Sequence, residues 1–144
     1  MLNLDVDWNL VGNHLLLMSV AYLLAFPIGW ERERAGHSAG LRTFSLVAVS
    51  ACAYILISLS VFSGEDAQSR AAQGLLTGIG FIGGGAILKD SARVKGLATA
   101  AAIWSTGAIG MAVAYRRLEV AIVLSALTFV TLHYLSRIEP DQHD

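Results

Sequence analysis

Residues 43–64 read TFSLVAVSACAYILISLSVFSG and contain no Asp, Glu, Lys or Arg in 22 positions. A helix of roughly 17–25 mainly apolar residues crosses the hydrocarbon core of a bilayer. A helix on the surface of a soluble domain instead carries charged side chains every three or four residues on one face. This stretch therefore predicts a helix that spans a membrane.

Four more stretches lack formal charge: Trp8–Trp30, Ala71–Leu88, Gly96–Tyr115 and Val120–Ser136. All 21 formal charges lie in the 44 residues outside the five stretches. A soluble chain of 144 residues, 55% of them hydrophobic, has too small an interior to bury that much apolar surface. We expect an all-α polytopic membrane protein. It forms one transmembrane domain, residues 1–144, with five spans at about 10–30, 43–63, 71–88, 97–115 and 119–135.

The positive charges predict how this bundle is oriented. Seven Lys and Arg residues fall on one side, namely Arg32, Arg34, Arg42, Lys89, Arg93, Lys95 and Arg137, and three fall on the other, namely Arg70, Arg116 and Arg117. Cytoplasmic loops carry the excess of Lys and Arg, so the N-terminus is expected outside and the C-terminus in the cytoplasm. The connections are short, which favours an up-down bundle in which consecutive helices are neighbours.

Composition excludes several classes of function. The net charge of −1 gives no basic surface for nucleic acid. The single cysteine, Cys52, excludes a disulfide framework, and we interpret it as a packing residue rather than an intermolecular bridge. No carboxylate lies in the middle of a span, and no catalytic or metal-binding motif occurs, so we expect neither enzymatic activity nor a cofactor.

A charged cluster, Glu31, Arg32, Glu33 and Arg34, follows the first span directly. Arg and Lys alone suffice for a stop signal at the cytoplasmic interface, so the two carboxylates need another explanation. The structural interpretation, which we favour, pairs them with Arg42, beside Thr43 in the first turn of the next helix, and with cations of the third loop. The alternative is a cation site, Mg²⁺ included, in which Glu31 and Glu33 are weak candidate ligands.

The third stretch is rich in glycine, with Gly74, Gly78, Gly80, Gly83, Gly84 and Gly85. Glycines let helix backbones approach closely in lipid, which favours simple packing at the centre of the bundle. The alternative is a helix broken at residues 83–85 whose free carbonyl groups line a path for an ion. Polar or bulky candidates within the spans are Gln73, Thr77, Thr99 and Trp104, and we expect Trp104 to fill space against these glycines.

Three blocks of sequence carry a resemblance to the MgtC/SapB family of bacterial membrane proteins. They are PIGWERERAG (27–36) running into AGLRT (39–43), GIGFIGGGAIL (78–88), and VKGLATAAAIW (94–104) followed by GAIG (107–110). The resemblance implies a five-helix inner-membrane domain with a cytoplasmic C-terminus. Many members carry a further cytoplasmic domain, so this chain resembles a short member. Where the family usually has Gly-Ala-Gly, this sequence has Gly83-Gly84-Gly85.

Family members are linked to growth in low magnesium and to virulence, and some are thought to act on ATP synthase or magnesium transporters. The leading hypothesis is therefore a non-enzymatic regulator tied to magnesium or membrane-potential homeostasis. Its expected partners are the lipid bilayer and either a second copy or another membrane protein. The alternative is an oligomeric channel or transporter with a path along the glycine-rich span. If Glu31 and Glu33 are engaged in a closed cluster, the regulator is favoured, and if they face an open vestibule, the conduit is.

Overall fold

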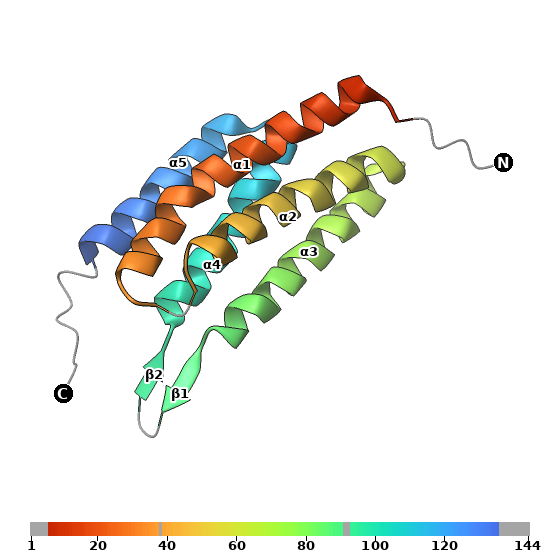
Figure 1. Cartoon of the computed structure of the whole chain (residues 1–144). Helices are drawn as coiled ribbons and strands as arrows, with labels where there is room; N and C mark the ends of the chain where they lie inside the picture. The colour runs from red at the N-terminus through yellow and green to blue at the C-terminus, as the bar shows by residue number, and fades with distance from the viewer. Residues whose placement is uncertain (1–5, 38, 91–92, 136–144) are drawn as a thin grey trace.

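The computed structural model describes residues 6–37, 39–90 and 93–135. Its elements are α1 (Trp8–Arg34), α2 (Leu41–Val61), α3 (Glu65–Gly85), β1 (Leu88–Asp90), β2 (Arg93–Lys95), α4 (Leu97–Ala114) and α5 (Leu118–Val130), which continues as a π-helical turn (Thr131–Leu135) (Figure 1). Five helices packed side by side confirm the predicted all-α bundle. That all five cross a membrane stays a prediction.

Four of the helices are long and apolar enough to cross a membrane, judged by length and composition: α1, α2, α4 and the helix from Leu118 to Leu135. The fourth predicted span, which forms α4, is therefore apolar enough to cross a membrane despite its small side chains. The helix α3 is as long as α2 but does not join this group. Its six glycines and its polar first turns add little hydropathy, so it is the least apolar helix of the five.

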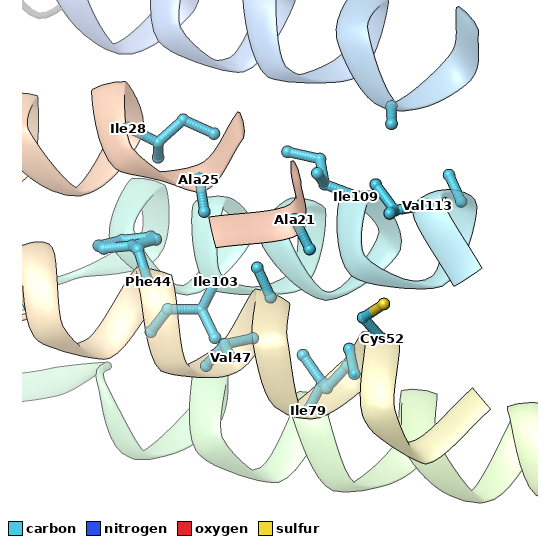
Figure 2. Packing of buried hydrophobic residues seen from close by; sticks show 14 of the residues in the cluster. Ala21, Ala25, Ile28, Phe44, Val47, Cys52, Ile79, Ile103, Ile109 and Val113 are labelled. Atoms are coloured by element: carbon cyan, nitrogen blue, oxygen red, sulfur yellow. The ribbon is translucent and has the colours of Figure 1, made fainter. Parts of the chain in front are cut away.

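The centre of the bundle is α4, which contacts each of the other four helices. In α4, 56% of the most apolar window is buried, against 22% in α1 and 17% in the last helix. Figure 2 shows Ile103 and Ile109 of α4 in one apolar layer with α1 and α2 side chains such as Ala25 and Phe44. Cys52 is fully buried in this layer, in agreement with a packing role.

Close approach at α4 depends on two of its own glycines. A Cβ atom added at Gly110 would collide with the backbone oxygen of Ala48 in α2, and one added at Gly107 would collide with the side chain of Ile79 in α3. Packing contacts, rather than a hydrophobic driving force, hold helices together in lipid, so these two positions set how closely α2 and α3 approach α4.

The glycine-rich helix α3 lies at the edge of the bundle, next to α2 and α4, so its expected place at the centre is wrong. Nothing lies within 4 Å of a Cβ built at Gly78, Gly80, Gly84 or Gly85. Of the α3 glycines, Gly83 is the one that approaches another described backbone, because a Cβ there would sit 3.2 Å from the carbonyl oxygen of Ala100. The glycine spacing indicates that another backbone can approach α3. At Gly78, Gly80, Gly84 and Gly85, however, no described helix of this chain does so.

The glycine run 83–85 ends α3 and does not break it. Ala86 and Ile87 donate backbone hydrogen bonds to Gly83 and Gly84 at 3.0 and 3.1 Å, which closes the last turn. An antiparallel hairpin follows, with Leu88 opposite Lys95, where the sequence predicted only a short loop. Gly96 ends this hairpin at φ +91°, and a Cβ there would collide with the carbonyl oxygen of Ala86.

The end of α1, the hairpin and the π-turn lie at one end of the bundle, called here the hairpin end (Figure 1). The start of α1 and the α2–α3 and α4–α5 connections lie at the other end. The loops assigned to the cytoplasm thus share one end, and their orientation to the cytoplasm stays a prediction. Three of the seven Lys and Arg residues assigned to the cytoplasmic side cannot be placed: Arg137 and the side chains of Lys89 and Arg93 lie outside the described residues.

A matched pair of substitutions tests the central role of α4. Gly110→Ala should lower the free energy of unfolding by about 1–3 kcal/mol, since the methyl group meets backbone of α2 that cannot rotate away. Gly78→Ala should leave stability unchanged or raise it by up to about 1 kcal/mol, because alanine favours the helix and nothing lies nearby. Thermal unfolding in one detergent, followed by circular dichroism, measures both. Equal losses would contradict the assignment of α4 as the central helix.

Candidate functional site

The charged cluster predicted at the end of α1 lies at the hairpin end, and its two carboxylates engage different helices. Glu31 Oε2 lies 3.1 Å from His133 Nδ1, and the two side chains are 18% and 27% exposed. His133 belongs to the π-turn that ends the last helix, and its ring stacks on Phe129 at 5.6 Å between centroids. Glu31 therefore ties α1 to the last helix.

Glu33 ties α1 to α2. Its Oε2 atom accepts a hydrogen bond of 2.8 Å from the backbone N–H of Leu41, the first residue of α2. The N-cap residue, Gly40, has no side chain for this role, and a Cβ there would sit 2.8 Å from Glu33 Oε2. A carboxylate at a helix N-terminus satisfies a free N–H group and interacts favourably with the helix dipole.

Arg32 lies between these two carboxylates in sequence and is only 2% exposed. It follows Ile28 by four residues, so it continues the face of α1 that packs in the core. Its Nε atom is buried and has no hydrogen-bond partner among the described residues. A buried N–H group without a hydrogen-bond partner costs free energy, because its desolvation is not offset by a hydrogen bond.

The other cations of the cluster stay near the surface. The guanidinium carbon of Arg34 lies 6.0 Å from the ring centroid of Trp30. Arg42 is exposed in the first turn of α2, beside the half-buried Thr43. In the described part of the chain Arg42 forms no ion pair, so its predicted pairing with Glu31 or Glu33 is wrong. The reason is geometric, since Glu33 accepts from the α2 backbone and Glu31 accepts from His133.

A cation site shared by Glu31 and Glu33 stays a prediction without geometric support. The two carboxylates engage different helices, and the described residues contain no group of three His, Cys, Asp or Glu side chains that could hold a metal ion.

The polar residues predicted within the spans do not gather with this cluster. Gln73 and Thr77 lie on an exposed face of α3, where the Thr77 hydroxyl donates to the Gln73 carbonyl oxygen at 2.9 Å. Thr99 is buried in the first turn of α4. Trp104 is 48% exposed, and the glycines at which α3 and α4 contact each other are Gly83, against Ala100, and Gly107, against Ile79. These contacts do not support the expectation that Trp104 packs against the α3 glycines.

Sequence reasoning missed His133 as the partner of Glu31. Part of the signal was present, because His133 lies near the end of the last span, and an odd number of spans puts that end on the same side of the bundle as the end of the first span. Which helices are neighbours could not be read from the sequence. Above this pair, the Ser125 hydroxyl donates to the Leu24 carbonyl oxygen at 2.6 Å and joins the same two helices.

A groove of about 290 Å³ opens between α1 and the last helix next to the Glu31–His133 pair. It is called here the α1–α5 groove. Its lining residues are Phe26, Pro27, Trp30, Glu31, Arg34, Phe129 and His133.

Removal of the Glu33 carboxylate tests its role as the cap of α2. Glu33→Ala should lower the free energy of unfolding by about 1 kcal/mol, the usual cost of losing an N-cap. Glu33→Gln retains an oxygen acceptor and should lose less. Thermal unfolding in detergent compares both variants with the wild type. If Glu33→Gln lowered the free energy of unfolding as much as Glu33→Ala does, the negative charge and not the hydrogen bond would carry the effect.

Arg32→Met tests whether the buried guanidinium stabilises the fold. A methionine of similar length fills the space without a charge, so the unfolding temperature should stay the same or rise. Arg42→Met is the matched control at an exposed position and should change little. A fall of several degrees in the Arg32 variant alone would show that the guanidinium has a strong stabilising partner.

Comparison with known proteins identifies the family. The sequence model of the MgtC family matches residues 18–140. The chain is 34% identical to Protein SrpB of Synechococcus elongatus, covering 92% of this chain and 79% of that protein. It is 39% identical to Protein MgtC of Brucella abortus and 40% identical to Protein MgtC of Salmonella typhimurium, covering 72% and 68% of this chain.

The chain spans less than half the length of these two MgtC proteins, 43% and 42%. None of these three relatives has an enzyme name. No solved structure matches the chain. The match over most of the sequence, together with the apolar helices, shows that this chain is a multi-pass membrane protein that belongs to the MgtC family.

Proposed function

We propose that this protein is a non-enzymatic regulator in the bacterial inner membrane, linked to magnesium or membrane-potential homeostasis and to adaptation to low magnesium or virulence. It acts by docking the outer face of α3 against a helix of a second copy or of another membrane protein. Family membership supports the physiological part of this proposal. The structure supports the docking part.

The observation that carries the proposal is the outer face of α3. Gln73, Thr77, Gly80 and Gly84 recur at helical spacing, and all four are exposed. The glycine, hydroxyl and amide groups of this face gain little from contact with lipid tails and suit close contact with another helix. The neighbouring Phe81 is 84% exposed and adds apolar surface that a partner helix would cover. The low hydropathy of α3 points the same way, since a helix of this composition is better accommodated beside a protein partner.

The two carboxylates at the hairpin end are each held by another helix, which favours a regulator over a conduit. Glu31 is engaged by His133 and also lines the α1–α5 groove, and the exposed Glu33 is engaged by the α2 backbone. They are also remote from Gln73 and Thr77, because α3 packs against α2 and α4 and leaves its polar face outside the protomer. The described part of one protomer therefore places these four residues on separate surfaces.

The alternative is a conduit formed by an oligomer. The same face of α3 favours it, because several copies placed around an axis would bring Thr77, Gly80 and Gly84 together. Proteoliposomes that contain only this protein distinguish the two functions. The regulator predicts no flux of magnesium, potassium or protons above that of empty liposomes. Flux that Gly84→Leu abolishes and that Ala126→Leu, at an exposed site on α5, preserves would overturn the regulator.

Photocrosslinking provides the positive arm of this test. A photoreactive residue in place of Gly84 should form a defined adduct with a membrane protein in cells grown in low magnesium. The same residue in place of Ala126 should not, although both positions are exposed. Equal labelling from the two positions would contradict docking through α3.

A further inference from the structure

We infer that the α1–α5 groove binds one phospholipid with a primary amine headgroup, whose phosphate contacts Arg34 and whose ammonium contacts Glu31. This inference does not depend on the proposed regulator function. It rests on the shape of the groove, on the charges at its end and on the helix contacts that hold its two walls.

The first wall is a ladder of side chains on α1. Phe26 and Trp30 lie edge to face at 5.5 Å between ring centroids, and Arg34 lies over the Trp30 ring. The three residues follow one another at intervals of four, so they share one face of the helix. Within the described part of the chain, the Arg34 guanidinium forms no hydrogen bond or ion pair, so its donors are available to a ligand.

The second wall comes from the last helix, where Phe129 and His133 stack in nearly parallel orientation, with 12° between their planes. His133 engages only one oxygen of Glu31, Oε2. The other carboxylate oxygen accepts no hydrogen bond from any described residue. Among the described residues, the groove thus has an aromatic body and, at its end, a guanidinium and a carboxylate oxygen that make no hydrogen bond.

These groups complement the two ends of a zwitterionic headgroup. A guanidinium binds phosphate through charge-assisted hydrogen bonds, and a carboxylate accepts hydrogen bonds from a primary ammonium. A choline headgroup lacks N–H groups for Glu31, and a glycerol headgroup lacks the positive charge. The aromatic wall suits an acyl chain, and Trp30, 49% exposed near the end of α1, is typical of residues at the membrane interface.

Two hydrogen bonds between α1 and the last helix fix the spacing of the two walls before a lipid binds. The Ser125–Leu24 and Glu31–His133 hydrogen bonds join the same two helices at 2.6 and 3.1 Å, about two helical turns apart along the last helix. A lipid that enters the groove therefore does not have to order the two walls, which favours specific binding over transient solvation.

Fluorescence quenching of Trp30 tests the inference. The reporter is the full chain with Trp8→Phe and Trp104→Phe, reconstituted in phosphatidylcholine vesicles. Small mole fractions of acyl-brominated phosphatidylethanolamine, phosphatidylglycerol or phosphatidylcholine are then added. Brominated phosphatidylethanolamine should quench Trp30 at about a tenfold lower mole fraction than the other two, the scale of one hydrogen bond to a charged group.

Two variants separate the headgroup contacts. Arg34→Gln should remove most of the preferential quenching of Trp30 by brominated phosphatidylethanolamine. Arg42 is an exposed arginine at the same end but outside the groove, so Arg42→Gln should leave this quenching unchanged. Glu31→Gln should abolish the preference for the amine headgroup, and circular dichroism checks that this variant remains folded. Equal quenching by the three lipids, or an Arg34 variant that behaves as wild type, would overturn the site. A preference for phosphatidylglycerol would overturn the amine assignment.

Discussion

The fold depends on the close approach of α4 to its neighbours, above all at Gly110, where the α4 backbone lies against the Ala48 carbonyl of α2. Lipid tails are as apolar as the helices themselves, so no hydrophobic driving force holds a membrane bundle together. What remains is contact between well-packed surfaces. The small residues of α4 allow four helices to pack around one, and larger side chains such as Phe44 and Ile55 fill the surrounding layer.

The charged residues at the hairpin end solve a different problem, which is how the outer helices are fixed to one another. Glu33 satisfies the first N–H group of α2, and Glu31 contacts the π-turn of the last helix. Two residues that alternate along one helix thus reach two different neighbours, because positions two apart point in nearly opposite directions. The carboxylates therefore serve as links between helices. Arg32, buried between them without a hydrogen bond at Nε, has no comparable structural explanation.

The sequence was sufficient for the helices but not for their arrangement. Charge-free stretches such as Thr43–Gly64 predict a helix because a long uncharged segment has few alternatives in a bilayer. The place of α3 could not be predicted, since glycine spacing permits close approach but does not say whether the approaching helix belongs to the same chain. The Glu31–His133 contact joins residues 102 positions apart, and it requires knowledge of which helices are neighbours. The hairpin was missed because its strands are only three residues each.

The position of α3 links the packing of the bundle to the proposed function. Its inner face is fixed to α4 at two points, Ile79 against Gly107 and Gly83 against Ala100. The glycines that allow this close contact also leave small and polar residues exposed on the other side of the helix, where Gln73, Thr77, Gly80 and Gly84 lie beside the exposed Phe81. Under the proposed function, this exposed face is the one that contacts a further helix. Small residues therefore account both for the close packing around α4 and for the open face of α3.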